Sequence, residues 1–138
     1  FFLWLDIPLT LLAFLATLGL LFLIAFGLTG LGFAFAWYME STAGFHAVMN
    51  LFLLPMWLLS GAFFPLVGLP AWLEYLVWVN PLTYAMAALR QALYLGVSFE
   101  SNCLPSTSIC LVITGLFSLL TFGISIILAS RRERGVVL

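Results

Sequence analysis

Uncharged stretches alternate with isolated charged residues along the chain, and three of these stretches are long. They are residues 7–39, 41–73 and 101–130. Each exceeds the ~20 residues that a helix needs to cross a bilayer. Asp6-Ile7-Pro8 is a helix-start pattern, because proline loses nothing in a first turn and a carboxylate there faces unpaired N–H groups. The pattern predicts membrane-spanning helices over about residues 8–38, 45–64 and 108–130.

The apolar segment before Asn80-Pro81 is too short to be a fourth span. Asn80 is a good N-cap and Pro81 a good first helical residue, so a second short helix is expected to follow and to end near Gly96. The two short helices form a predicted hairpin over about residues 70–96. Its rings suit the headgroup region, where an amphipathic side chain keeps its apolar body in lipid and its polar atom wet: Trp72, Tyr75 and Trp78. The expected fold is all-α and polytopic, with three transmembrane helices plus a re-entrant or interfacial helical hairpin before the last span.

Small and polar residues inside the predicted spans indicate where helices pack. Four hydroxyls of the third span recur at steps of four, three and four, which places them on one face: Thr114, Ser118, Thr121 and Ser125. They could bond across to another helix or back to the carbonyl four residues earlier. The glycines at 27, 30 and 32 would let a neighbouring helix approach the first span. Pro55 is expected to kink the second span, because it removes one helix hydrogen bond.

Composition agrees with lipid as the solvent. Of the 138 residues 65% are hydrophobic and 7% charged, the mean hydropathy is +1.26 and the formal net charge is −1. This excludes a water-soluble globule, whose surface needs far more polar groups. The chain has no lysine for a phosphate-binding loop and too few basic residues for nucleic acid. One histidine and two cysteines are a thin supply of metal ligands, so no metal site and no cofactor are expected in this chain.

Basic residues predict the orientation, since arginines concentrate on the cytoplasmic side of membranes. Three of the four follow the third span directly: Arg131, Arg132 and Arg134. The C-terminus is therefore expected in the cytoplasm of a multi-pass protein of the plasma or inner membrane. Residues 39–46 would share that side, and residues 66–107 would lie outside. Cys103 and Cys110 would then lie in or near an oxidising compartment, where they could form a disulfide.

Four linked motifs resemble the ABC-2 type transporter permeases, the membrane subunits of a class of ABC exporters. They are Leu58-Leu59-Ser60-Gly61-Ala62-Phe63-Phe64-Pro65, Leu69-Pro70-Ala71-Trp72-Leu73, Asn80-Pro81-Leu82-Thr83-Tyr84 and Ala88-Leu89-Arg90. The resemblance implies that residues 1–138 are the C-terminal half of a permease membrane domain, cut from a longer protein that begins before Phe1. It also implies ATP hydrolysis on a separate ATP-binding subunit, a second permease copy, and export by alternating access. Apolar spans with small hydroxyls would suit an amphipathic or lipid-linked substrate.

The resemblance places such a hairpin on the outside, and our own hypothesis is that it forms an extracellular gate, with candidate residues Glu74, Asn80, Pro81, Tyr84 and Arg90. Glu74 and Arg90 could pair across the hairpin, or each could reach separately to the wet surface. Glu40 and His46 are the polar groups of the predicted cytoplasmic loop that could contact the ATPase, although a solvated loop is the simpler interpretation.

Three other classes of function are weaker interpretations. An ion-coupled carrier would use Asp6, Glu74 or Arg90 as buried titrating groups, yet acidic residues fall at the ends of the predicted spans. An intramembrane hydrolase with Ser60 and His46 fails on distance, because fourteen helical residues separate them by roughly 21 Å. A membrane scaffold without transport activity stays open.

Overall fold

Helices account for nearly every residue that the structure, a computed structural model, describes: 10–63, 68–94 and 105–135. In chain order they are α1 (Leu11–Tyr38), α2 (Thr42–Trp57), the π-helical η2 (Leu58–Ala62), α3 (Ala71–Val79), α4 (Pro81–Leu93) and α5 (Thr107–Gly135). Three helices are long and apolar enough to cross a membrane: Leu11–Tyr38, Thr42–Ala62 and Thr107–Arg131. The predicted all-α membrane fold is confirmed.

Local capping sets where the first two spans begin. The Thr10 hydroxyl accepts from the N–H of Ala13 at 3.1 Å, so α1 begins at Leu11 and not at about residue 8. The Asp6-Ile7-Pro8 pattern lies outside the described residues. The Ser41 hydroxyl accepts from the N–H of Gly44 at 3.1 Å, so α2 begins three residues before the predicted start. Both corrections arise because a nearby Ser or Thr supplies the capping oxygen.

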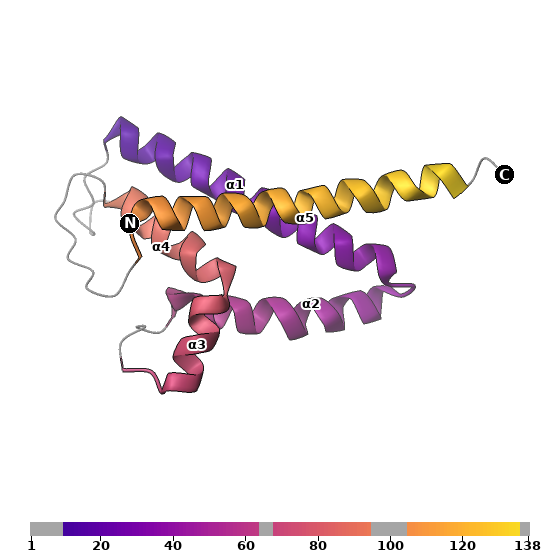
Figure 1. Cartoon of the computed structure of the whole chain (residues 1–138), viewed down its shortest axis with the longest axis horizontal. Coiled ribbons are helices and arrows are strands. Elements are labelled where there is room, and N and C mark those ends of the chain that lie inside the picture. Colours follow the sequence, from indigo (N-terminus) through magenta and orange to yellow (C-terminus); the bar gives the residue numbers. More distant parts are fainter. Residues whose placement is uncertain (1–9, 64–67, 95–104, 136–138) are drawn as a thin grey trace.

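The most extensive helix–helix contact joins α1 and α5, which lie side by side and cross each other (Figure 1). The predicted hydroxyl face of α5 is buried there. Each of its four hydroxyls lies within 3.0 Å of the carbonyl oxygen four residues earlier, and two also reach α1. Ser118 lies 2.8 Å from the Leu23 oxygen, and Ser125 lies 2.8 Å from the Gly30 oxygen. Bonding within α5 and bonding across to α1, the two modes considered from the sequence, therefore both occur. Ser118 and Ser125 each share one hydroxyl proton between two carbonyl acceptors.

Two glycines of α1 make this close approach sterically feasible. A Cβ atom on Gly27 would lie 2.7 Å from the Ser118 Oγ atom, and one on Gly30 would lie 2.9 Å from the backbone nitrogen of Phe122. Lipid provides little hydrophobic force between helices, so close backbone packing is a main source of their affinity. The expectation that glycines admit a neighbouring helix is confirmed at these two positions. Gly32 meets only the flexible tip of Met49, at 3.5 Å.

The hairpin forms as predicted, with α3 and α4 joined at Asn80, but its two helices differ in burial. α4 packs against α1 and α5 through a face rich in alanine, while α3 exposes the rings of Trp72 and Tyr75. The predicted end of α4, at Gly96, lies outside the described residues. The hairpin lies at one end of the molecule, and the connection between α1 and α2 lies at the other, toward the end of α5 (Figure 1).

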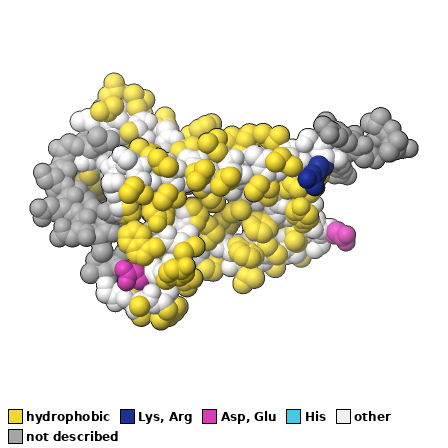
Figure 2. All heavy atoms as spheres, in the orientation of Figure 1, with side chains coloured by type: hydrophobic (Ala, Val, Ile, Leu, Met, Phe, Trp, Pro, Cys, Tyr) yellow, Lys and Arg dark blue, Asp and Glu magenta, His cyan; other side chains and the backbone are white. Residues whose placement is uncertain are grey.

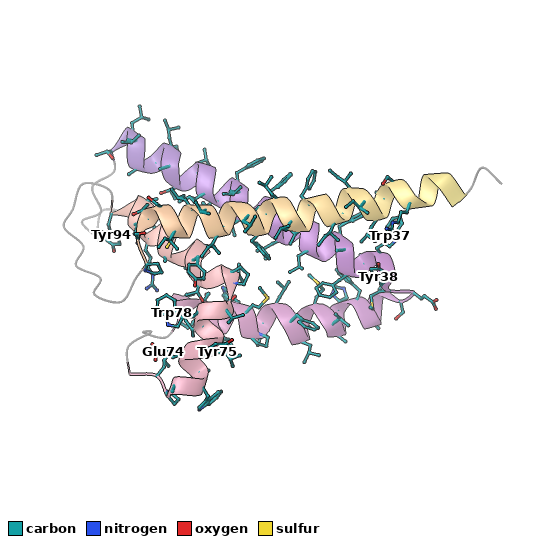
Figure 3. The ribbon with its side chains drawn as sticks, viewed as in Figure 1. Trp37, Tyr38, Glu74, Tyr75, Trp78 and Tyr94 are labelled. Atoms are coloured by element: carbon teal, nitrogen blue, oxygen red, sulfur yellow. The ribbon has the colours of Figure 1, made fainter. Side chains whose placement is uncertain are left out.

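Charged side chains and several tryptophans and tyrosines lie near these two ends. Figure 2 shows a largely apolar surface between charged groups at the two ends. Figure 3 shows Trp37 and Tyr38 at the end of the molecule where α1 connects to α2. At the hairpin end it shows a second aromatic group: Tyr75, Trp78 and Tyr94. Aromatic residues gather at both membrane–water interfaces of spanning proteins. This arrangement fits a protein whose long helices cross a bilayer, with one end of the molecule at each membrane–water interface.

Candidate functional site at the joint between the second span and the hairpin

The second span ends in an irregular turn that leaves backbone carbonyls available. Pro55 lies inside α2, and η2 follows it with a wider hydrogen-bonding pattern over Leu58–Ala62. Gly61 closes the turn at φ 78° and ψ 7°, a left-handed conformation that glycine adopts without a Cβ clash. The break expected near Pro55 is therefore located several residues later, at η2. Such π-helical turns leave carbonyl oxygens without their usual partners and occur often at functional sites.

Asn80 joins this turn to the hairpin through both ends of its amide. The amide oxygen accepts from the N–H of Leu82 at 3.1 Å, which makes Asn80 the N-cap of α4, with Pro81 as the first helical residue. The amide nitrogen donates to the Met56 carbonyl at 2.6 Å. The side chain is buried, so the two bonds satisfy groups that water cannot reach. The predicted capping role of Asn80 is confirmed, and the bond to α2 is an addition.

Two further side chains of α4 donate to the same turn. The Thr83 hydroxyl lies 2.8 Å from the Val77 oxygen and 3.4 Å from the Leu59 oxygen, and it is 1% exposed. The Arg90 guanidinium donates to the carbonyl oxygen of Gly61. With Asn80, these residues attach one face of α4 to three carbonyls of the second span. We call this arrangement the joint: donors Asn80, Thr83 and Arg90, with acceptors Met56, Leu59 and Gly61.

The two candidate partners on the hairpin, Glu74 and Arg90, do not pair within the described part of the chain. The Glu74 carboxylate accepts instead from the Trp78 indole at 3.4 Å, while Arg90 bonds to Gly61. Tyr84 donates its hydroxyl to the Trp78 carbonyl at 2.8 Å, which holds α3 against α4. Backbone carbonyls are among the partners that arginines use within membranes. Arg90 therefore belongs to the joint, and Glu74 lies apart from it.

The remaining candidate residues lie away from the joint. Glu40 and His46 are exposed at the α1–α2 connection and the start of α2, and His46 stacks edge-on against Phe45 at 5.5 Å. Ser60 is buried and bonds to the Trp57 carbonyl at 2.6 Å, far along α2 from His46. This geometry leaves Ser60 and His46 no shared chemistry. No group of three metal-ligating side chains occurs among the described residues.

The Cys103–Cys110 disulfide considered from the sequence stays a prediction, and of the two residues the structure describes only Cys110. It is a free thiol, fully buried where α4 and α5 meet α1, and it lies 3.7 Å from the Pro105 carbonyl. Cys103 lies outside the described residues. Cys110 is already helical and points into the core, which explains why it is not available at the surface.

Sequence reasoning missed half of the joint because its acceptors are backbone atoms. The motifs pointed to Asn80 and Arg90, but no side-chain pattern marks a carbonyl of Met56 or Gly61 as a partner. The available signal was Pro55 followed by Ser60-Gly61, since proline and glycine weaken a helix at neighbouring positions. Thr83 could have been recognised as a buried hydroxyl near the start of α4.

The fold and the joint define a class of protein: a multi-pass membrane protein of three long helices, with a short hairpin bonded to one of them. The sequence model of the ABC-2 type transporter family matches residues 1–94, and the chain belongs to this family. The match covers α1, α2, η2 and the hairpin and ends before α5. A search of curated proteins and a search of solved structures each found no match. The chain is thus a permease component of a membrane transporter.

Proposed function

We propose that this chain is part of the permease subunit of an ATP-driven exporter and that its joint controls the outer end of the translocation path. The observation that carries the proposal is the attachment of α4 to the end of the second span by Asn80, Thr83 and Arg90, in a chain of the ABC-2 family. These bonds make any movement of the second span move the hairpin. A force applied at the opposite end of the span would therefore reach the hairpin.

The energy would come from a separate ATP-binding subunit, since this chain has no lysine with which to build a phosphate-binding loop. A working unit would contain the N-terminal part of the permease and a second copy of it. The arginines in the last turns of α5 support a cytoplasmic C-terminus under the positive-inside rule. Glu40 and His46 would then be exposed on the cytoplasmic side, where the ATPase could contact them. The membrane would be the plasma or inner membrane.

Differences in packing support alternating access by rigid bodies. The glycines hold α1 and α5 together at backbone distance, whereas no residue of α2 is buried. Packed elements move as units, and loosely packed elements can shift against them. The second span is therefore the part expected to rock against the body formed by α1, α4 and α5, and the joint is where that movement would reach the hairpin.

An amphipathic or lipid-linked cargo suits the surfaces that these helices offer. Most of the exposed side chains of the three spans are leucine, isoleucine or aromatic. The carboxylates of Glu40 and Glu74 are exposed and lie outside the three long helices, so neither position supports ion coupling. The α5 hydroxyls, which also suggested such a cargo, are occupied in helix packing.

The partner and the energy source can be tested together. We expect the full-length protein to co-purify with an ATP-binding subunit and to move a fluorescent lipid analogue across proteoliposomes only when ATP is supplied. An ATPase variant that binds but does not hydrolyse ATP is the matched control. Equal transport with and without ATP would contradict the proposal and favour an ion-coupled carrier.

The joint makes a separate prediction about Arg90 and Glu74. Arg90→Gln should lower the export rate severalfold, because it removes the charge-assisted bond to the Gly61 carbonyl. Glu74→Gln should leave export near the wild-type rate, because its exposed carboxylate bonds only to Trp78 on its own helix. Export is measured in the same proteoliposomes at equal protein amounts. Wild-type export by Arg90→Gln would remove Arg90 from the gate.

A further inference from the structure

The three helices that pack together, α1, α4 and α5, line a pocket near the hairpin end of the molecule. Its volume is about 580 Å³. Sites for small molecules usually measure about 300–1,000 Å³. All of its described lining residues come from these three helices and the cap of α4, and none comes from α2 or α3. The pocket therefore belongs to one packed body, and an occupant would stay with that body when the second span moves.

The polar side chains of this pocket lie at its hairpin end. Thr107 is the first residue of α5, and Tyr94 is the C-cap of α4, three residues after Gln91. Figure 3 shows Tyr94 at the hairpin end. The wall formed by Leu20 and Leu23 lies deeper, because α1 runs away from this end (Figure 1). The pocket therefore suits a molecule with a polar head near the membrane surface and an apolar tail toward the bilayer interior.

The apolar part of the pocket extends well into one leaflet. Between Ala16 and Leu23, which both line it, α1 advances seven residues or about 10 Å. Half of a hydrocarbon core about 30 Å thick is about 15 Å. Gly19 and Leu111 line the pocket and are exposed, so it opens to the side. A lipid tail could enter from the side while its head stays at the level of Tyr94.

The charge of the lining restricts the headgroup. None of the described residues that line the pocket carries a charge. A phosphate or carboxylate would enter without a cation to balance it, and an unpaired charge in apolar surroundings is costly. An uncharged head loses far less hydration energy on entry. The pocket therefore favours a neutral lipid.

Gln91 gives this pocket an acceptor that lacks a donor. Its amide nitrogen donates to the Pro105 carbonyl at 3.0 Å, which fixes the orientation of the amide because a carbonyl can only accept. Its amide oxygen is enclosed and has no hydrogen-bond donor among the described residues. Such an unpaired acceptor costs stability. The last torsion of a glutamine is broad, so a modest rotation would present this oxygen to a ligand.

We propose that this pocket binds an uncharged lipid with a hydroxyl headgroup, whose O–H donates to the Gln91 amide oxygen. The chain of the lipid lies against Leu20, Leu23 and Ala88, where it covers apolar surface. Ala88 lies on α4, which also carries the joint, so the bound lipid stabilises the helix to which the second span is attached. The inference goes beyond the proposed function, because binding needs neither ATP nor transport.

Photolabelling of the full-length protein in phosphatidylcholine nanodiscs tests the site. The probe is dodecanol with a diazirine near the end of its chain, and labelled peptides are identified by mass spectrometry. We expect the label on the pocket-lining parts of α1, α4 and α5, and competition by unlabelled dodecanol. Dodecyl methyl ether, which has no donor, and dodecyl phosphate, which is charged, should each compete severalfold less well.

Filling the pocket gives the matched pair of variants. Gly19→Leu should lower labelling severalfold, because Gly19 lines the pocket and a Cβ there meets nothing within 4 Å, so the new side chain occupies space without a clash. Gly123→Leu is the control, since its Cβ also meets nothing within 4 Å and it lies on α5 away from the lining residues. Labelling of this variant should equal that of wild type.

Gln91→Leu tests the headgroup contact separately from the shape of the pocket. Dodecanol should lose its advantage over the methyl ether in this variant, a difference that a general loss of packing would not produce. Equal labelling of wild type and Gly19→Leu would overturn the site. Absence of label from the pocket would also overturn it and would indicate that another part of the permease covers this surface. Equal competition by dodecanol and its ether in the wild-type protein would overturn recognition of a hydroxyl. The vesicle assay decides ATP-driven export separately from all of these outcomes.

Discussion

Gly30→Ala is expected to destabilise the packed α1–α5 pair by about 1–3 kcal/mol, the usual cost of overpacking a close contact. The new methyl group would lie 2.9 Å from the Phe122 nitrogen and 3.0 Å from the Thr121 carbonyl carbon. Both atoms belong to the backbone, so the whole helix must move to relieve the clash. That movement would also stretch the 2.8 Å bond from Ser125 to the Gly30 carbonyl.

The measurement is the midpoint temperature of unfolding of the full-length protein in detergent. Gly19→Ala is the matched control, because it makes the same change in the same helix and its Cβ would meet nothing within 4 Å. We expect Gly19→Ala to match or slightly exceed wild type, since alanine is the better helix former. A Gly30→Ala protein as stable as Gly19→Ala would show that α1 and α5 do not pack at backbone distance.

Asn80→Ala should have the second large effect, because one side chain both caps α4 and joins it to the second span. Loss of a cap costs about 0.5–2 kcal/mol. The Met56 carbonyl also loses its 2.6 Å donor. We expect lower thermal stability and a severalfold loss of export, measured in detergent and in proteoliposomes respectively.

Asn80→Ser separates the two roles of this residue. Serine keeps an oxygen for the N–H of Leu82 but is too short to reach Met56. Stability should therefore stay within about 1 kcal/mol of wild type, as for an exchange between good caps, while export falls. Wild-type export by Asn80→Ser would show that the bond to Met56 plays no part in transport and that only the cap matters.

In the hairpin, the start of α4 could be predicted from the sequence, but the partner of Arg90 could not. Asn80-Pro81 predicted the helix start correctly, because capping depends on the two residues themselves and their nearest backbone atoms. The partner of Arg90 could not be predicted, because the Gly61 carbonyl becomes available only through the π-helical turn and the packing of α4 beside it. For the same reason, the sequence could not show that Arg90 bonds to the Gly61 carbonyl while Glu74 bonds to Trp78. The role of the joint in transport stays a prediction.

The sequence by itself determined that this chain lies in lipid, how many long helices it can send across, where the short hairpin falls and which face of α5 meets protein. These properties depend on apolar length, charge and helical period, which are local. Only the tertiary structure decided that Ser118 and Ser125 bond to α1, that α4 is attached to the second span and that α1, α4 and α5 line a common pocket. Those features join residues far apart in the chain, and distance in space follows from packing.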